Sequence, residues 1–244
     1  RSKTSVSIIV PAYKEEDFIK NALENLLEVF RNSNRHFEII VVVDEATNDK
    51  TLDIAIDVGN RAKEIIVVSR KGKQGIGSAI REGIKNSSKS SILIATAEIS
   101  EDPLDLVKMM EKMDHGYDMV IGNRFYKNAK REGYASKKYF GNRLCNYTIK
   151  LLFGIKSNDI TNGVKAYQSH ILKNIQTSSY GFEIFAEIPI KVYLNGYRNF
   201  AEIPIDHKAR SEAYSKFNLV KEGRRFMLAV LKCYFYNDRK KKSG

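Results

Sequence analysis

Short apolar runs alternate with amphipathic segments along the first half of the chain. Five runs predict buried strands, at residues 6–10, 37–43, 64–68, 91–95 and 118–122. Between them, apolar side chains recur at helical spacing, as in Phe18, Ala22, Leu26 and Phe30. Strands that alternate with helices form parallel sheets covered on both faces. The pattern therefore predicts an α/β fold with a mostly parallel central sheet flanked by helices.

The second half of the chain is less regular and more basic. After a polar loop at 123–134, the pattern predicts a helix at 137–153, a strand-like run at 159–167, a helix at 182–194 and a strand at 199–205. Residues 217–236 form an amphipathic helix that leads into a basic tail, and this helix either lies on an anionic membrane surface or packs on the domain. We therefore expect one domain over 1–216 and a separate segment over 217–244.

The charge balance favours anionic partners. Lys plus Arg number 41 against 29 for Asp plus Glu, a formal net charge of +12 over 244 residues. Phosphorylated substrates, nucleic acid and acidic membranes all fit this charge, but no nucleic-acid-binding module is visible. No segment reaches the roughly 18 apolar residues that span a bilayer. Because the sequence begins with Arg1 rather than Met and ends after a lysine run, we keep open a membrane segment beyond Gly244.

A carboxylate follows the fourth predicted strand. Asp102 and Pro103 are a typical N-cap and first helical residue, so Glu98 lies between the end of the strand and the next helix. Ligands of open α/β sheets bind at the carboxyl ends of the strands, which makes Glu98 a candidate ligand for a metal or a phosphate-bound cation. A solvated turn glutamate is the alternative.

A basic, glycine-rich turn precedes the helix expected at 78–85. Gly75 and Gly77 stand beside Arg70, Lys71 and Lys73. Backbone N–H groups of such a turn can approach phosphate oxygens closely, and the helix N-terminus is positive. A simple turn explains the same residues nearly as well.

An ordered series of motifs resembles the inverting GT-A nucleotide-sugar glycosyltransferases, and among them the polyprenyl-phosphate (dolichol-phosphate) mannose synthases. The matching segments are 10–16 (VPAYKEE), 43–51 (VDEATNDKT), Arg70 with 73–77 (KQGIG), 122–124 (GNR), 159–167 (DITNGVKAY), 196–197 (GY), 202–205 (EIPI), and Arg210 with 215–216 (SK). The likeness extends from about residue 5 to 216. It implies a GT-A, Rossmann-like fold with a C-terminal amphipathic helix.

The resemblance also implies a nucleotide-sugar site with a divalent cation, Mg²⁺ or Mn²⁺. The positions that match its nucleotide contacts are Pro11, Tyr13, Glu15, Asp44, Arg70 and Lys73. The family binds its metal through an Asp-x-Asp triplet, which reads Thr96-Ala97-Glu98 here. Glu98, with Ser100 nearby, is the implied ligand, and the loss of one carboxylate at Thr96 predicts a weaker or differently built metal site.

On the acceptor side, the resemblance implies a set of phosphate-binding residues. The matching positions are Arg124, Lys138, Asn142 and Lys216, with Arg210 beside them. A phosphate monoester with a second pKa of about 6 is ionised at neutral pH, so it needs no general base to attack the sugar. We expect in-line attack with inversion, with Glu98, Arg124 and Arg210 as the catalytic residues.

These inferences together predict a hexosyltransferase that moves a sugar, mannose from GDP-mannose in the first instance, to a polyprenyl or dolichyl phosphate. Such an enzyme would be peripheral on the cytoplasmic face of a membrane. Transfer to a saccharide hydroxyl is one alternative, although it would require a general base that the sequence does not offer. A non-catalytic nucleotide-sugar-binding protein is the other.

Overall fold

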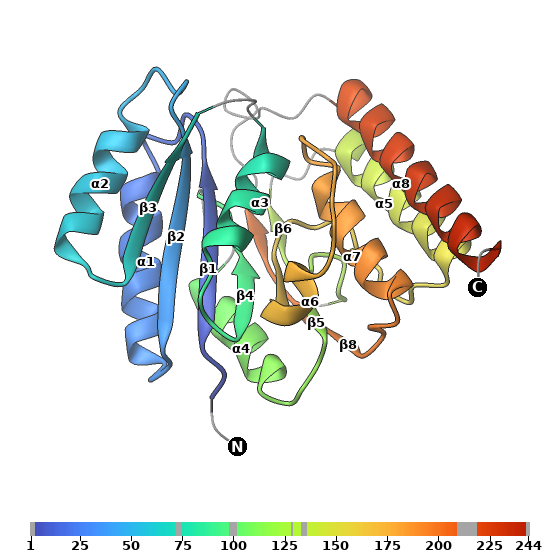
Figure 1. The fold of residues 1–244 in the computed structure, drawn as a ribbon, viewed down its shortest axis with the longest axis horizontal. Helices are drawn as coiled ribbons and strands as arrows, with labels where there is room; N and C mark the ends of the chain where they lie inside the picture. Colours follow the sequence, from blue (N-terminus) through green and yellow to red (C-terminus); the bar gives the residue numbers. More distant parts are fainter. Residues whose placement is uncertain are drawn as a thin grey trace.

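The central feature of the fold is a seven-stranded sheet with the strand order β3-β2-β1-β4-β7-β5-β8. Figure 1 shows this sheet running through the molecule, with helices on both faces. The computed structural model describes residues 3–71, 75–97, 102–127, 129–132, 136–208 and 219–242. Among these, the side chains of 132, 136–138, 208, 219–222 and 237–242 are not described.

The described elements follow the predicted alternation. The strands are β1 (Val6–Ala12), β2 (Phe37–Asp44), β3 (Ile65–Arg70), β4 (Ser91–Ile94), β5 (Met119–Asn123), β6 (Arg131–Glu132), β7 (Lys165–Gln168), β8 (Phe200–Pro204) and β9 (His207–Lys208). The helices are α1 (Ile19–Asn32), α2 (Thr51–Arg61), α3 (Ile76–Asn86), α4 (Pro103–Met113), α5 (Ser136–Phe153), α6 (Ser169–Lys173), α7 (Ile184–Leu194) and α8 (Leu219–Lys242). All five strands predicted in the first half are confirmed.

The sheet is parallel except at β7, which runs antiparallel between β4 and β5. The predicted strand at 159–167 is wrong in its first half, because residues 159–164 form a turn instead. In that turn Asn162 N–H donates to the Asp159 carbonyl (3.2 Å) and the Asn162 side chain to the Gly122 carbonyl (2.6 Å). The small parallel pair of β6 and β9 and the short helix α6 were not predicted.

Alternating side chains of the strands supply two apolar cores. Ile8 faces a core that includes α1, α2 and α4, whereas Ile9 faces one that includes α3, α6 and α7. This arrangement is the sandwich that parallel strands require, since both faces of each strand must be buried. Helices α5 and α8 lie side by side at one end of the molecule, next to α7 (Figure 1).

Helix α4, which follows the central strand β4, begins as predicted. The Asp102 carboxylate accepts a hydrogen bond from Leu104 N–H (2.9 Å), and Pro103 is the first helical residue. Leu104, the next residue, is 56% exposed, whereas Leu106 and Met109 face the core. The capping residue therefore fixes where α4 begins, while packing decides its buried face.

Helix α8 packs on the domain through Phe226, Ala229, Val230 and Cys233. It continues to Lys242, so the predicted basic tail is largely helical. Within the described residues, none of the helices is long and apolar enough to cross a bilayer.

An ion pair between the buried Arg35 and the half-buried Asp114 holds the amino-end edge of the sheet together, and its removal should weaken the fold. Arg35 donates to both carboxylate oxygens of Asp114 (2.8 and 2.7 Å), and Thr4 N–H donates to one of them (2.8 Å). Burial alone would raise the pKa of Asp114, but the hydrogen bonds from Arg35 and Thr4 outweigh it and lower this pKa from 3.8 to about 2. The ionised carboxylate therefore stabilises the folded chain above pH 4, and this contribution is lost as the pH falls from about 4 to 2.

We expect Asp114→Asn to lower the free energy of unfolding by about 2 kcal/mol at pH 7. This is the free energy that corresponds to the lowering of the Asp114 pKa on folding. Urea unfolding of both proteins at several pH values measures the difference. The difference should shrink between pH 4 and pH 2; a difference that is constant over this range would contradict the assignment.

Candidate active site

The loops that follow β1 and β2 are joined by hydrogen bonds at the carboxyl edge of the sheet. Thr47 accepts from Lys14 N–H (3.2 Å), and Thr51 accepts from Glu15 N–H (2.8 Å). Both threonine hydroxyls donate to the Asp49 carboxylate. Burial favours the neutral acid, but these hydrogen bonds prevail and lower the pKa of Asp49. An ionised Asp49 therefore holds the two loops together.

Two of the predicted nucleotide-binding residues, Asp44 and Arg70, form an ion pair. They occupy matching positions on the adjacent strands β2 and β3, and the Arg70 Nη2 to Asp44 Oδ1 distance is 3.0 Å. The same nitrogen donates to the Gly75 carbonyl (2.9 Å), and Nη1 donates to the Ser78 hydroxyl. Arg70 therefore ties the end of β2 to the start of α3.

The other described nucleotide-binding candidates surround this pair on β1 and the loop after it. Pro11 and Glu15 are half-buried, whereas the Tyr13 ring is exposed and has the Lys14 ammonium 5.8 Å from its centre. The structure thus places an exposed aromatic ring directly after β1 and a buried acid at the end of the neighbouring strand β2, at one edge of the sheet. Such an edge can accept a planar base and a ribose.

The glycine turn before α3 lies directly against a distant segment, residues 178–181. Gly77 N–H donates to the Tyr180 carbonyl (2.9 Å). A Cβ atom at Gly75 would lie 2.3 Å from the Tyr180 carbonyl oxygen, and one at Gly77 would lie 2.3 Å from the Ser179 carbonyl oxygen. The two glycines are therefore required for close backbone packing, and the N–H group of Gly77 is engaged in it. Residues 72–74 lie outside the described residues.

On the acceptor side, the Arg124 guanidinium pairs with Asp159. Arg124 follows β5 directly and is 7% exposed, and Asp159 is fully buried. Nε and Nη2 of Arg124 donate to the two carboxylate oxygens (2.9 and 2.8 Å), and its backbone N–H donates to one of them (2.9 Å). The cations of Arg124 and Arg143 both lie near the Phe125 ring, at 5.6 and 5.1 Å from its centre.

Two further acceptor-side candidates are on α5. Asn142 is half-buried, and its carbonyl accepts from the Asn146 side chain (2.8 Å). Asn146 also donates to the Thr161 hydroxyl (3.0 Å), which ties α5 to the turn at 159–164. Lys138 lies on the first turns of α5, but its side chain is not among those described.

The predicted metal site falls on residues outside those that the structure describes. The candidates that lie outside the described residues are Glu98, Ser100, Lys73, Arg210 and Lys216. Thr96 is half-buried and Ala97 is buried at the end of β4. Within the part of the chain that the structure describes, no group of three His, Cys, Asp or Glu side chains is arranged to hold a metal ion.

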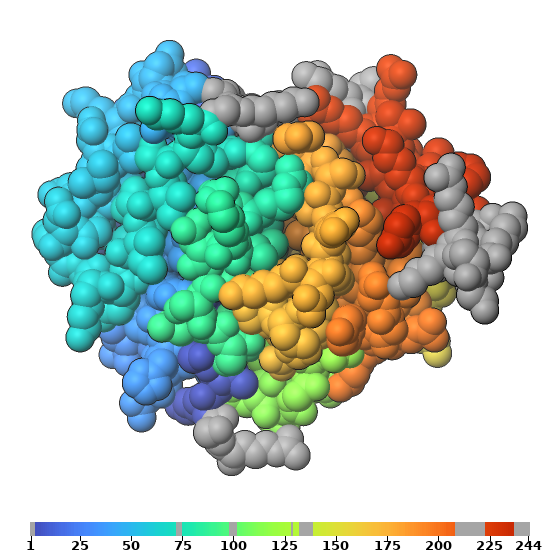
Figure 2. Space-filling view, in the orientation of Figure 1, coloured from blue at the N-terminus to red at the C-terminus, as the bar shows by residue number. Residues whose placement is uncertain are grey.

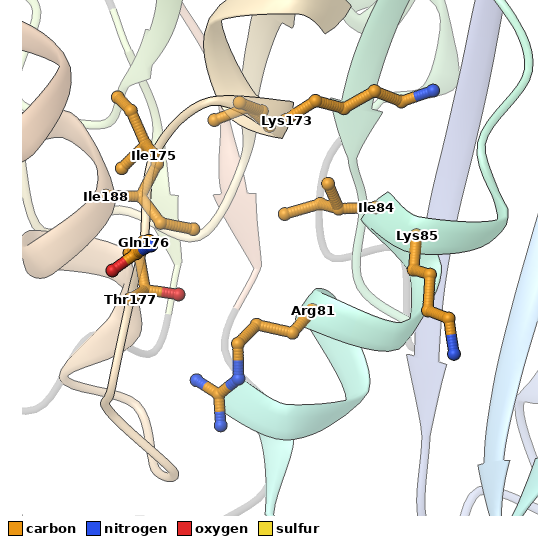
Figure 3. A pocket seen from close by; sticks show the side chains of 9 residues that line it. Arg81, Ile84, Lys85, Lys173, Ile175, Gln176, Thr177 and Ile188 are labelled. Atoms are coloured by element: carbon orange, nitrogen blue, oxygen red, sulfur yellow. The ribbon is translucent and has the colours of Figure 1, made fainter.

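A cavity of about 590 Å³ lies away from this edge, between α3 and the segment from α6 to α7. Figure 3 shows Arg81 and Lys85 of α3 on one side, and Lys173 and Ile175 on the other. In Figure 2 these two parts of the chain, drawn in green and yellow, meet along the visible face. None of the predicted site residues whose side chains the structure describes lines the cavity, so we do not assign it to the active site.

Sequence reasoning gave no role to several residues that the structure places in the site. Asp49, Asp159 and Lys165 all occur in the quoted motifs, but nothing in their local pattern shows what they contact. Their partners are between 2 and 35 residues away along the chain. Motif membership was the only available signal.

A mostly parallel sheet covered by helices on both faces, with a buried acid, an arginine and a glycine turn at its carboxyl edge, defines an α/β protein of the doubly wound class. Residues 7–176 match the family model described as Glycosyl transferase family 2. The chain therefore belongs to this family.

Curated relatives include enzymes that act on polyprenyl phosphates. A dolichol-phosphate mannosyltransferase of Pyrococcus furiosus is 26% identical over 86% of this chain and 58% of its own length. An undecaprenyl-phosphate 4-deoxy-4-formamido-L-arabinose transferase of Shewanella sediminis is 25% identical over 88% of this chain and 62% of its own length. The chain thus spans about three fifths of the length of these relatives. An uncharacterized protein of Methanocaldococcus jannaschii is 30% identical over 84% of this chain and 82% of its own length.

Solved structures confirm the GT-A fold. Glucosyl-3-phosphoglycerate synthase of Mycobacterium tuberculosis, in complex with uridine diphosphate, superposes with a TM-score of 0.73. It is 16% identical, and the match covers 95% of this chain and 80% of that one. Another structure of the same enzyme also contains Mn²⁺ and glucosyl-3-phosphoglycerate, with a TM-score of 0.73.

Proposed function

We propose that this chain is the glycosyltransferase domain of an enzyme that moves a hexose from a nucleotide sugar to a polyprenyl phosphate. The names of the relatives support a lipid-phosphate acceptor, with mannose and GDP-mannose as the first donor to test. Structures of the neighbouring synthase instead contain a water-soluble acceptor, phosphoglyceric acid. The two acceptor classes differ in whether the enzyme must reach a membrane.

The observation that favours the lipid acceptor is an outward apolar stripe on α5. It consists of four residues at helical spacing, 64 to 73% exposed: Phe140, Leu144, Tyr147 and Leu151. The opposite side of α5, including Ile149, packs on the domain. The helix is therefore apolar on two faces, and it carries four basic and no acidic residues. A stripe of this kind is unfavourable in water and suits an anionic lipid surface.

Helix α8, next to α5, has the same character. Its outward side chains include Leu228, Leu231, Phe235 and Tyr236, which are 40 to 60% exposed. Basic residues, among them Arg224 and Lys232, accompany them. Lysine and arginine attract the anionic headgroups that the apolar side chains approach. We therefore propose that α5 and α8 hold the domain on the cytoplasmic face of a membrane, in the same part of the fold as Lys138 and Asn142.

The chemistry follows from the two phosphorylated substrates. Tyr13, Glu15, Asp44 and Arg70 would bind the nucleotide at the edge formed by β1, β2 and β3. The acceptor phosphate is already ionised at neutral pH, so its oxygen can attack the sugar in line without a general base. Inversion at the sugar carbon is the expected outcome.

A divalent cation would neutralise the charge that develops on the departing nucleoside diphosphate. The presence of Mn²⁺ in the neighbouring synthase supports this proposal, and Glu98 with Ser100 remains the proposed ligand pair. Thr96 and Ala97, which precede them, contribute no carboxylate. Carbonyl oxygens, hydroxyl oxygens or water molecules would therefore have to complete the coordination shell of the cation.

An assay with two acceptors tests the proposal. The full chain is incubated with UDP- and GDP-sugars, Mg²⁺ or Mn²⁺, and either a polyprenyl phosphate in vesicles or 3-phosphoglycerate. We expect a metal-dependent glycolipid and release of nucleoside diphosphate with the lipid acceptor only. Turnover with phosphoglycerate alone would contradict the lipid acceptor, and donor binding without turnover in any combination would support the non-catalytic alternative.

A further inference from the structure

A set of buried polar side chains lies behind the end of β5. It is centred on Asp159, which is fully buried and whose carboxylate binds both the side chain and the backbone N–H of Arg124. Asp159 N–H donates in turn to the Ser157 hydroxyl (3.1 Å), and that hydroxyl donates to Glu202 on β8 (2.5 Å). Asp159 is therefore anchored from the side away from Arg124.

A second buried cation belongs to the same set. Lys165 on β7 is fully buried, and its ammonium donates to the backbone carbonyls of Asn162 and Phe185 (the latter at 3.1 Å). Burial, and to a lesser degree the charge of Arg124, lowers the pKa of Lys165 to about 7, against the opposing effect of Asp159. Lys165 thus lies close enough to Asp159 and Arg124 for their charges to act on it, but its hydrogen bonds go to backbone carbonyls.

The geometry of the Arg124–Asp159 pair is directional. The carboxylate takes Nε and Nη2, the side edge of the planar guanidinium, which fixes the plane of the group. The third bond, to Arg124 N–H, also fixes the backbone at the point where the chain leaves β5. Removing the carboxylate would therefore release both the side chain and its attachment to the sheet.

We propose that Asp159 is a positioning residue for the phosphate acceptor, acting by orienting Arg124 at the carboxyl edge of the sheet. This inference rests on the proposed function, in which Arg124 binds the acceptor phosphate. A guanidinium binds phosphate strongly only when its planar fork is held in place, so orientation should matter more than the partial cancellation of its charge by Asp159.

The test compares Asp159→Asn, Arg124→Lys and the double variant. We expect Asp159→Asn to raise the KM for the acceptor on the order of 10- to 100-fold, as loss of a buried charged partner does, with the KM for the nucleotide sugar changed less than twofold. If Asp159 acts through Arg124, adding Asp159→Asn to Arg124→Lys should have little further effect. An unchanged or lower acceptor KM in Asp159→Asn would overturn the proposal, as would fully additive effects.

Asp114→Asn is the matched control, because it breaks another bidentate arginine–aspartate pair at the opposite edge of the sheet. It should lower stability without changing the acceptor KM; a similar KM increase in Asp114→Asn would assign the effect to stability and overturn the proposal. If Asp159→Asn does not fold, Ser157→Ala, which removes the hydroxyl bonded to Asp159 N–H, should raise the acceptor KM less but in the same direction.

Binding separates this inference from the proposed function. Association of a two-isoprene prenyl phosphate and of inorganic phosphate is measured by ³¹P NMR for the wild type and Asp159→Asn. If the wild type transfers no sugar to lipid but binds these phosphates through Asp159, the proposed function fails and the inference stands. If transfer to lipid occurs and Asp159→Asn binds and reacts like the wild type, the proposed function stands and the inference about Asp159 fails. If the wild type neither binds nor reacts, both are wrong.

Discussion

Replacing Leu144 and Leu151 by aspartate together should abolish binding to vesicles that contain anionic lipid and lower transfer to a long polyprenyl phosphate about 100-fold. Full burial of a leucine side chain in an apolar environment contributes about 1.5 to 3 kcal/mol to the binding free energy. Loss of two leucines that are even partly inserted into the membrane therefore accounts for an effect of this order. The two residues are 67 and 73% exposed, so the fold loses almost no packing with them. Vesicle sedimentation and the glycolipid assay measure the two effects.

The control uses another exposed apolar residue on a helix. Ile56 on α2 is 43% exposed, and Ile56→Asp should leave both vesicle binding and transfer unchanged. Transfer to a water-soluble two-isoprene prenyl phosphate should also survive in the leucine variant, because that acceptor needs no membrane. Equal loss with both acceptors, or normal vesicle binding, would show that the stripe of α5 does not contact lipid.

Gly75→Ala and Gly77→Ala should each weaken nucleotide-sugar binding on the order of 100-fold and lower stability by about 2 kcal/mol, the range of overpacked sites. The new Cβ would lie 2.3 Å from a carbonyl oxygen of the segment 178–181, so one of the two backbones must move. Gly75 also accepts from Arg70, which pairs with Asp44. A shift of this turn therefore disturbs the candidate donor site directly.

Titration with UDP and GDP, and thermal unfolding, measure these effects. Gly116→Ala is the matched control for Gly75, since Gly116 also has a positive φ (+83°) but nothing within 4 Å of its Cβ position. Gly116→Ala should lower the free energy of unfolding by about 1 kcal/mol, because alanine is strained at a positive φ, and it should leave nucleotide binding intact. If both variants impair binding equally, the contact with Tyr180 is not the cause.

The order of elements, and the edge of the sheet at which Asp44 and Arg70 meet, could be predicted because their signals are local. Strands such as 37–44 are β-branched throughout since both faces are buried, and Asp102 with Pro103 specifies the first turn of α4. Asp44 and Arg70 end adjacent parallel strands, so the carboxyl-edge rule alone brings them to one edge. The structure adds that they form an ion pair.

The acceptor side depends on contacts that no local pattern encodes. Residues 159–164 of the strand predicted at 159–167 form a turn, in which the Asp159 carboxylate accepts from Arg124, 35 residues earlier in the chain. The pattern of β7 does not reveal that it is antiparallel, since a strand buried on both faces looks the same in either direction. Likewise, the apolar residues of α5 do not disclose which of them face outward.

The sequence by itself determined the family, the alternation of strands and helices and the edge at which Asp44 and Arg70 meet, because motifs, periodicity and capping act between near neighbours. Only the tertiary structure decided that Asp159 holds Arg124, that Gly75 and Gly77 admit the segment around Tyr180, and that one stripe of α5 is exposed. These features depend on which distant surfaces meet when the sheet is covered, and that choice is made by the packing of the whole chain.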